Sequence, residues 1–337
     1  MQAYRIRPGS TIDGLEKFET PSRELGPHEV RIGVRAVSLN FRDLMIAGGF
    51  YPLSSDRPVI PCSDGAGAVL EVGAAVKKFR AGDRVAGIFF PDWIEGGVSP
   101  EKIGGALGGE TDGMLREEVI LPESAVVAIP VHLSFAEAAA LPCAAVTAWN
   151  ALFSAGALIP GSSVLILGTG GVSVTALQLA KAAGLHAIVT SSSDEKLERV
   201  RQLGADETIN YKTHPEWQTE VLRLTGGRGV DLALEVGGTD TMARSMASTR
   251  TGGAVAVIGG VSGFAGGAEI IPLIFGAKRV LGIFVGSREM FENLNRFIGV
   301  AKIKPVIDRT FAFDQAKEAY AHLSGGGHFG KVVITLD

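Results

Sequence analysis

Two different rhythms of apolar and polar positions divide this chain. From Glu29 to about Val127, short apolar and β-branched stretches alternate with Gly, Pro and Asp, and little helical periodicity lies between them. The strand-like stretches are VRIGVRAVSL (30–39), GAGAVLEVG (65–73), DRVAGIFF (83–90) and EEVILP (117–122). This half of the chain therefore predicts a twisted antiparallel barrel or sandwich.

From about Phe135 the pattern changes to helical spacing, and apolar strands then alternate with amphipathic helices. Residues 134–152 predict one long helix of small residues. The expected order after it is a strand at 162–167, a helix through Ala182, a strand at 186–190, a helix from Glu195 to Leu203, and strands at 206–210, 230–236, 252–259 and 278–285. Because parallel strands need covering crossovers, this order predicts a doubly wound parallel sheet.

The last part of the chain predicts a return to the first domain. After Val285 the pattern gives a helix, a polar strand at 308–313, a helix at 314–323 and a strand at 331–336. A chain of 337 residues is long enough for two domains. No repeat or low-complexity linker interrupts it.

Composition and charge narrow the function classes. No uncharged apolar run of about 18 residues occurs, and the N-terminal stretch lacks the apolar core of a secretory signal. We therefore expect a soluble, cytoplasmic protein. The net charge of −4 gives no indication of a basic surface that would bind nucleic acid or a membrane. The two cysteines, Cys62 and Cys143, exclude a disulfide framework and a four-cysteine zinc lobe.

The most informative stretch is LILGTGGVSVTALQLAKAAG, in which an apolar strand, Val164 to Leu167, runs into a glycine-rich turn and then a helix. Glycines at such a turn let backbone N–H groups and the positive helix end approach a pyrophosphate. Ser173 takes the place of the third small residue of the G-x-G-x-x-G pattern. A glycine-rich turn without a ligand is the alternative. The candidate cofactor residues here are Gly168, Gly170, Gly171 and Val172.

The end of the next strand predicts which dinucleotide is bound. A carboxylate there would bind the ribose 2′-OH of NAD, whereas a 2′-phosphate requires its absence and a nearby cation. This strand ends in Ser191, Ser192 and Ser193, with Lys196 one helical turn later and Tyr211 after the following strand. We therefore expect NADP(H) rather than NAD(H). Ser192 and Glu195 also fit a helix capping box, which is compatible with phosphate binding.

Four segments in this order carry a resemblance to a known family: GAGAVLEVGAAVKKFRAGDRV, LPCAAVTAWNAL, LGTGGVSVTALQLAKAAG and the closing GKVVI. Together they resemble the medium-chain dehydrogenase/reductase superfamily, in its quinone oxidoreductase-like and alcohol dehydrogenase-like branches. The resemblance implies an α/β fold with a GroES-like β-rich catalytic domain at 1–140, a Rossmann doubly wound parallel-sheet domain at 141–284, and a segment at 285–337 that returns to the catalytic domain.

Zinc alcohol dehydrogenases of this superfamily use a Cys, the His of a GHE triplet, and a further Cys or Asp. Here the matching positions are Asn40, the triplet Cys62-Ser63-Asp64, and Cys143. One thiolate cannot hold catalytic zinc, which needs three protein ligands, so we expect no zinc. An irregular set of Cys62, Asp64 and Cys143 is the alternative. Otherwise both cysteines act as small buried apolar residues.

The resemblance implies reversible hydride transfer between nicotinamide and a carbonyl, conjugated enone or quinone. Without zinc, hydrogen-bond donors must stabilise the developing charge on oxygen. The candidate catalytic residues are Asn40, Arg42 and Tyr51. Asn40 would orient the nicotinamide or polarise the substrate. Tyr51 would assist protonation or merely pack in the core, and Asp43 would fix the loop.

The resemblance also assigns residues around the cofactor. These are Thr147, Gly259, Gly260, Val285, Ser287, Phe329 and Lys331. Segment 278–285 is expected to pair two copies into a homodimer, because an apolar edge strand needs covering. The Gly-rich insert 91–113 replaces the zinc lobe and is expected to act as a lid.

Three functions are compatible with these features. The leading one is a zinc-independent, NADPH-dependent oxidoreductase that acts on quinones, enones or aldehydes. The second is an NAD(P)-dependent alcohol dehydrogenase, with or without an irregular zinc site. The third is a dinucleotide-binding sensor or scaffold with little turnover.

Overall fold

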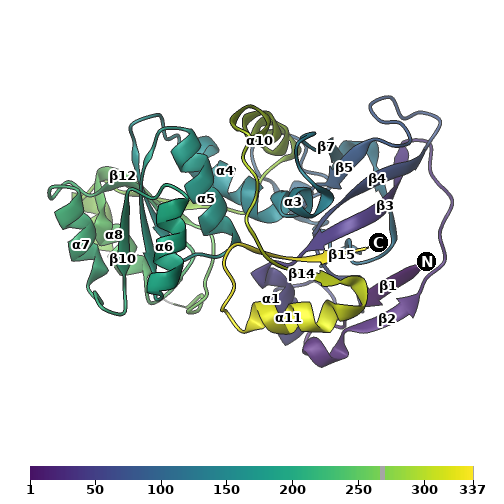
Figure 1. The fold of residues 1–337 in the computed structure, drawn as a ribbon, viewed down its shortest axis with the longest axis horizontal. Coiled ribbons are helices and arrows are strands. Elements are labelled where there is room, and N and C mark those ends of the chain that lie inside the picture. The colour runs from purple at the N-terminus through teal and green to yellow at the C-terminus, as the bar shows by residue number, and fades with distance from the viewer. Residues whose placement is uncertain (266–269, 337) are drawn as a thin grey trace. The chain divides into compact units, whose positions relative to one another are not determined.

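A computed structural model describes residues 1–265 and 270–336, which form two compact units. Unit 1 comprises Met1–Val146 and Gly286–Asp337, and unit 2 comprises Thr147–Val285. The sequence placed the two boundaries at 140/141 and 284/285. Figure 1 shows the elements of both units along the chain.

Unit 1 is built on a seven-stranded sheet. Its strands run in the order β14 (Ile307–Ala312), β15 (Lys331–Thr335), β3 (Glu29–Ser38), β4 (Asp64–Val72), β5 (Arg84–Gly87) and β7 (Val126–Ala128), with β6 (Glu118–Pro122) also paired to β3. β15 pairs antiparallel with β3 through Val333 and Ser38, so the C-terminal segment does return to the N-terminal domain. A separate pair joins β1 (Gln2–Arg5) and β2 (Glu16–Glu19).

Helices pack against this sheet. The helices of unit 1 are α1 (Phe41–Gly48), α2 (Pro100–Ile103), α3 (Phe135–Ala139), α10 (Arg288–Ala301) and α11 (Ala316–Ser324). Contacts join α3 to β3 and β4, and α11 to β14, β15 and α1. The buried face of α11 carries Tyr320, which is among the largest fully buried side chains.

Unit 2 is the predicted parallel sheet, with strands in the order β10 (Glu207–Asn210), β9 (His186–Ser191), β8 (Ser163–Leu167), β11 (Val230–Glu235), β12 (Thr249–Val257) and β13 (Arg279–Gly282). All neighbouring pairs are parallel. Numbered from β8 as strand 1, the strands lie in the order 3-2-1-4-5-6, as in dinucleotide-binding sheets. The strand order reverses between β8 and β11, although all the strands remain parallel. The Rossmann prediction is therefore confirmed.

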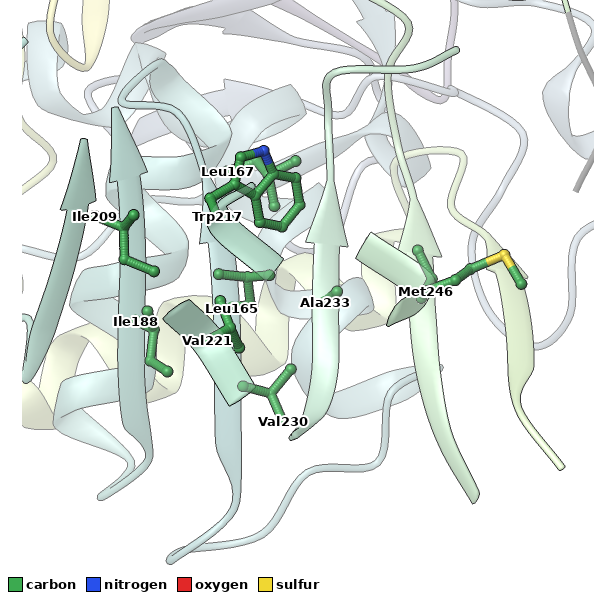
Figure 2. Close-up of a cluster of buried hydrophobic side chains, with 10 residues drawn as sticks. Leu165, Leu167, Ile188, Ile209, Trp217, Val221, Val230, Ala233 and Met246 are labelled. Atoms are coloured by element: carbon green, nitrogen blue, oxygen red, sulfur yellow. The ribbon is translucent and has the colours of Figure 1, made fainter. Parts of the chain in front are cut away.

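The helices of unit 2 are α4 (Val146–Trp149), α5 (Gly171–Ala182), α6 (Asp194–Gln202), α7 (Trp217–Leu224), α8 (Met242–Ser248) and α9 (Ile270–Phe275). Side chains of α7 and α8, among them Trp217, Val221 and Met246, pack on one face of the sheet (Figure 2). They meet Leu165, Val230 and Val255 of the strands, and α5 and α6 contact β8, β9 and β10. Both strand faces are thus covered, which explains their almost continuous apolar sequence.

The long helix expected at 134–152 is broken into four pieces. α3 ends at Ala139, a π-helical turn covers Leu141–Ala145, and a second one covers Asn150–Ser154 after α4. Pro142 has no N–H to donate, so the hydrogen-bond ladder shifts around it. The strand expected at 278–285 is also shorter, and it ends at Gly282.

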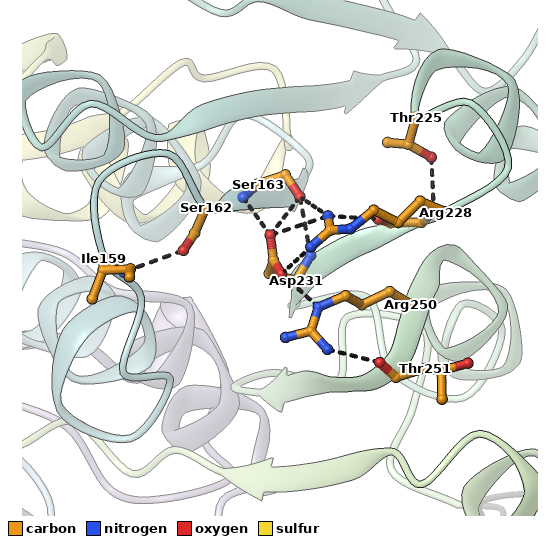
Figure 3. A network of polar contacts seen from close by, with 9 residues as sticks. Ile159, Ser162, Ser163, Thr225, Arg228, Asp231, Arg250 and Thr251 are labelled. Atoms are coloured by element: carbon orange, nitrogen blue, oxygen red, sulfur yellow. Dashed lines mark hydrogen bonds and ion pairs between the residues drawn. The ribbon is translucent and has the colours of Figure 1, made fainter.

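A polar cluster ties together the amino ends of three strands of unit 2 (Figure 3). Asp231 Oδ2 accepts from Ser163 N at 2.8 Å and from Ser163 Oγ at 2.9 Å. Its Oδ1 accepts from Arg228 Nη2 at 2.7 Å and from Arg250 Nε at 2.6 Å. Burial alone would raise the pKa of Asp231, but these hydrogen bonds outweigh it and lower the pKa below the ordinary carboxyl value.

We expect Asp231→Asn to lower the free energy of unfolding by about 2 kcal/mol at pH 7, because it removes charge-assisted hydrogen bonds. The folded pKa is depressed, so this stabilisation is present above the unfolded pKa of about 4 and fades as pH falls below it. Urea unfolding at pH 7 and at pH 3 measures both effects. Equal wild-type and variant stabilities at pH 7 would contradict the prediction.

Candidate functional site

The turn after β8 is built to receive an anion. Gly168 has φ 74°, a left-handed conformation that favours glycine, and a Cβ built there would meet nothing within 4 Å. Gly170 is the N-cap of α5, and no side chain caps this end. The Ser173 hydroxyl donates to the carbonyl of Leu167 at 2.6 Å, which holds the first turn of α5 against β8. The backbone N–H groups of that turn can therefore bind a pyrophosphate.

The residues predicted to select the dinucleotide lie together at the ends of β9 and β10. Tyr211 N donates to the carbonyl of Ser191 at 3.0 Å, and Ser192 follows β9 directly. The helix cap is Ser193, whose Oγ accepts from Lys196 N at 3.3 Å, so the predicted capping box of Ser192 and Glu195 is wrong by one residue. Asp194, one of two acids in the first turn of α6, accepts from Asn210 Nδ2 at 2.7 Å.

Glu235, which the sequence reasoning missed, organises the edge of the sheet at the end of β11. This carboxylate is 0% exposed. It accepts hydrogen bonds from Gly237 N at 2.6 Å, Gly238 N at 2.9 Å, Thr241 Oγ1 at 2.7 Å and the hydroxyl of Ser245. The sequence contained a sign of this role, since Glu235 is an acid at the end of the largely apolar stretch VDLALE.

The other predicted cofactor residues of unit 2 flank this edge. Gly259 and Gly260 follow β12, and a Cβ at Gly259 would lie 3.0 Å from the carbonyl oxygen of Val236. Val285 has φ 54°, and its carbonyl accepts from Asn150 Nδ2 at 2.8 Å. Thr147 is buried in α4.

In unit 1, a buried polar network begins at the N-terminus of α1. Asn40 is the N-cap residue, and its backbone N–H donates to Asp43 Oδ2 at 2.8 Å. Asp43 therefore fixes this loop, as the sequence indicated. Asn40 and Asp43 form a capping box, and Asn40 is 9% exposed. Its Oδ1 accepts from Lys331 Nζ at 2.5 Å, and its Nδ2 donates to Ser63 Oγ at 3.5 Å.

The network closes on Asp64, at the start of β4. Ser63 Oγ donates to Asp64 Oδ1 at 2.7 Å, and Cys143 N donates to Asp64 Oδ2 at 3.1 Å. Lys331 Nζ lies 3.9 Å from Asp64 Oδ2 and donates to the carbonyl of Leu39 at 2.7 Å. Burial raises the pKa of Asp64 above its ordinary value, and Lys331 is the main group opposing that rise. Burial raises the pKa of Asp43 to about 6, against the lowering effect of Arg42.

Arg42 packs its guanidinium against two aromatic rings and donates a hydrogen bond through Nη1. Its guanidinium lies 4.8 Å from the ring centroid of Tyr51 and 4.7 Å from that of Phe89. Its Nη1 donates to the carbonyl of Leu107 at 2.8 Å. The catalytic role of Arg42 stays a prediction, since its Nε and Nη2 atoms are buried and have no hydrogen-bond partner among the residues that the structure describes. Tyr51 remains a half-buried candidate beside it.

The second half of the insert 91–113 packs closely on unit 1. A Cβ at Gly108 would lie 2.6 Å from the carbonyl carbon of Cys62, and one at Gly109 would lie 2.1 Å from Arg42 Nη2. Glu110 Oε1 accepts from Ser54 N at 2.8 Å. This half forms a wall around Arg42 and Cys62, and the role of the insert as a lid stays a prediction.

The donors at the position of the zinc site in related enzymes do not fit a zinc ion. Within 1–265 and 270–336, no three His, Cys, Asp or Glu side chains gather as metal ligands would. Burial, and then Asp43, raises the pKa of Cys62 well above its ordinary value. Burial, and then Asp64, raises the pKa of Cys143 to about 12. Thiolates are the zinc ligands, and here an ammonium group lies beside the carboxylate.

Three predicted cofactor residues have structural partners inside unit 1. Ser287 is buried and caps α10, since its Oγ accepts from Met290 N at 3.2 Å. Phe329 is buried, and its N–H donates to Asp308 Oδ1 at 3.0 Å. Lys331 is 3% exposed, and its ammonium is directed to Asn40. All three residues belong to unit 1, and their roles at the cofactor stay predictions.

Comparisons with known proteins agree with this geometry. Residues 26–131 match the alcohol dehydrogenase GroES-like domain family, and residues 171–299 match the zinc-binding dehydrogenase family. A zinc-type alcohol dehydrogenase-like protein of Schizosaccharomyces pombe is 45% identical over 96% of this chain and 94% of its own. The 2-methylene-furan-3-one reductase of Solanum lycopersicum is 32% identical over 99% of this chain and 79% of its own.

Solved structures show the same fold. An NAD-dependent alcohol dehydrogenase has a TM-score of 0.90 and 34% identity, with 100% of both chains covered. A quinone oxidoreductase of Pseudomonas syringae has a TM-score of 0.84 and 28% identity, with 99% of both covered. Within the described ranges, no helix has the length and apolar character to cross a bilayer. The chain therefore belongs to the medium-chain dehydrogenase/reductase superfamily, as an NAD(P)-binding oxidoreductase similar to alcohol dehydrogenases and quinone oxidoreductases.

Proposed function

We propose that this oxidoreductase works without zinc and uses NADPH to reduce conjugated enones, quinones or aldehydes. The observation that carries the proposal is the buried set of Asn40, Ser63, Asp64 and Lys331 at the position where zinc relatives hold their metal. An amide and an ammonium group supply hydrogen-bond donors there. The names of the tomato reductase and the bacterial quinone oxidoreductase support this substrate class.

The reaction needs a hydride donor, an aligned acceptor and a place for negative charge on oxygen. When bound, reduced nicotinamide would supply the hydride to the acceptor. A proton from solvent completes the reduction, so NADPH, H⁺ and enone give NADP⁺ and a saturated ketone. The chain's own contribution is orientation and donors for the acceptor oxygen, and Asn40 is the donor we assign.

NADPH is proposed on the residues at the end of β9. Ser191 and Ser192 occupy the position where NAD-binding enzymes use a carboxylate, and the cation of Lys196 lies in the first turn of α6. The acid Asp194 is engaged with Asn210. A 2′-phosphate is therefore favoured over a free 2′-hydroxyl.

The second candidate is an NAD(P)-dependent alcohol dehydrogenase, which is favoured by the relative of that name at 34% identity. Elemental analysis of untagged protein separates the two candidates. Stoichiometric zinc, with activity lost on chelation and regained with zinc alone, would favour this second function.

We expect Asn40→Ala to lower kcat for enone reduction about 100-fold, because it removes a donor to the charge that develops on oxygen. KM for NADPH should change little. Steady-state kinetics over a panel of enones, quinones and aldehydes measures this. Asn293→Ala on α10 is the matched control and should behave as wild type. Wild-type turnover by Asn40→Ala across the panel would contradict the assignment.

The dinucleotide preference is tested directly. The wild type should have a higher kcat/KM with NADPH than with NADH, and Ser191→Asp should reverse the order by placing a carboxylate at the ribose position. Initial rates with both cofactors measure it. A wild type that prefers NADH would show that the serine cluster does not select the phosphate.

We propose that two copies of the chain pair through the edge of the unit 2 sheet. β13 is the last strand of that sheet, and α9 beside it exposes Ile270, Ile271, Ile274 and Phe275, the last being 83% exposed. An uncovered apolar edge favours association. A second copy presents the same edge, so a two-fold symmetric pairing covers both.

We expect Phe275→Glu to convert the dimer into a monomer, because it places a charge in the apolar contact. Light scattering after size-exclusion chromatography measures the mass. Val300→Glu, an exposed residue on α10, is the control. A monomeric wild type would contradict the pairing.

A further inference from the structure

Asn40 lies at the N-cap of α1, where it forms a capping box with Asp43. Asparagine is favoured at this position because its side-chain oxygen can accept from the first turn. The same oxygen accepts from Lys331 Nζ at 2.5 Å. The amide thus joins the start of α1 to a lysine of the C-terminal strand.

The orientation of this amide follows from its partners. An ammonium group has donors only, so the amide atom that faces Lys331 must be Oδ1. Nδ2 then lies on the other side, 3.5 Å from Ser63 Oγ. The Ser63 hydroxyl donates onward to Asp64 Oδ1 at 2.7 Å. These hydrogen bonds run in one direction, from Lys331 through Asn40 and Ser63 to Asp64.

The charge of Lys331 acts on the amide at short range. The lysine is 3% exposed, and the oppositely charged Asp64 Oδ2 lies at 3.9 Å, farther than Asn40 Oδ1. A cation at a carbonyl oxygen polarises the amide and makes its N–H groups stronger donors, and the effect is larger where water is excluded. Nδ2 carries two hydrogens: it donates to Ser63 Oγ over a long contact, and a hydrogen bond from Asn40 also acts to lower the pKa of Asp64.

We propose that Lys331 is a positioning residue for reduction. It locks the Asn40 amide with Nδ2 turned away from the lysine, and it polarises the N–H groups of that amide as donors for the oxygen of the electron acceptor. The positive charge that zinc relatives place directly on oxygen is relayed here through an amide. This inference rests on the proposed function, because Asn40 is the donor assigned there.

The test compares Lys331→Met, which removes the donors and the charge, with Lys331→Gln, which keeps an N–H donor. Lys331→Met should lower kcat for enone reduction at least about 10-fold with KM for NADPH unchanged, and Lys331→Gln should recover part of the loss. The control Lys317→Met removes a surface lysine that donates to the carbonyl of Asp13 and should keep wild-type rates.

A double-mutant cycle separates positioning from stability. In an Asn40→Ala background, Lys331→Met should change kcat by less than about two-fold, since the group it acts on is gone. Melting temperatures of all variants are measured alongside. Multiplicative losses in the double variant, or a Lys331→Met enzyme with wild-type kcat, would overturn the proposal.

Neutron diffraction from deuterium-exchanged crystals of the wild type reads the orientation without any activity. Deuterium on the Asn40 nitrogen, with that nitrogen turned away from Lys331, is the expected result. The nitrogen facing Lys331 would overturn the proposal even if the enzyme turns over. A wild type that reduces no acceptor in the panel would contradict the proposed function, and the neutron map would still decide the orientation.

Discussion

The buried ion pair of Lys331 and Asp64 is the interaction on which the catalytic unit depends. Neither charge could remain in a protein interior alone, because desolvation costs far more than a single neutral hydrogen bond returns. Each is supported by further groups: Leu39 O and Asn40 Oδ1 for the lysine, Ser63 and Cys143 N for the carboxylate. The pair therefore orients the surrounding polar groups, and it joins strand β15 to the start of α1 and β4.

In unit 2, the residues that stabilise the parallel sheet and the groups that can bind a ligand lie at opposite ends of the strands. At the amino ends of its strands, Asp231 is satisfied by Ser163, Arg228 and Arg250, which leaves little capacity for a ligand. At the carboxyl ends, glycines and uncapped N–H groups of α5 leave capacity open. Glu235 lies at the carboxyl end but serves stability. Its carboxylate holds the following loop through Gly237 N and Gly238 N, so those N–H groups cannot bind a ligand. Substitutions at the two edges should thus affect different properties.

Local pattern predicted most of the fold. The strands of unit 2, the turn at Gly168 to Val172 and the return of the C-terminal strand follow from periodicity and motif spacing. What could not be predicted depended on contacts between distant segments. The resemblance predicts Lys331 at the cofactor, and its contact with Asn40 follows only from the placement of β15 beside β3. The packing of Arg42 against Phe89 and its bond to Leu107 likewise depend on distant segments. The broken helix after Ala139 depended on how the chain accommodates Pro142.

The return of the C-terminal strand also sets an order of assembly. Unit 2 is one continuous segment, whereas unit 1 is made of two segments on either side of it. A ribosome therefore completes the nucleotide-binding unit while the partner of Asp64 is still unsynthesised. The buried partners of Asp64 are complete only once β15, which begins at Lys331, has joined the sheet beside β3.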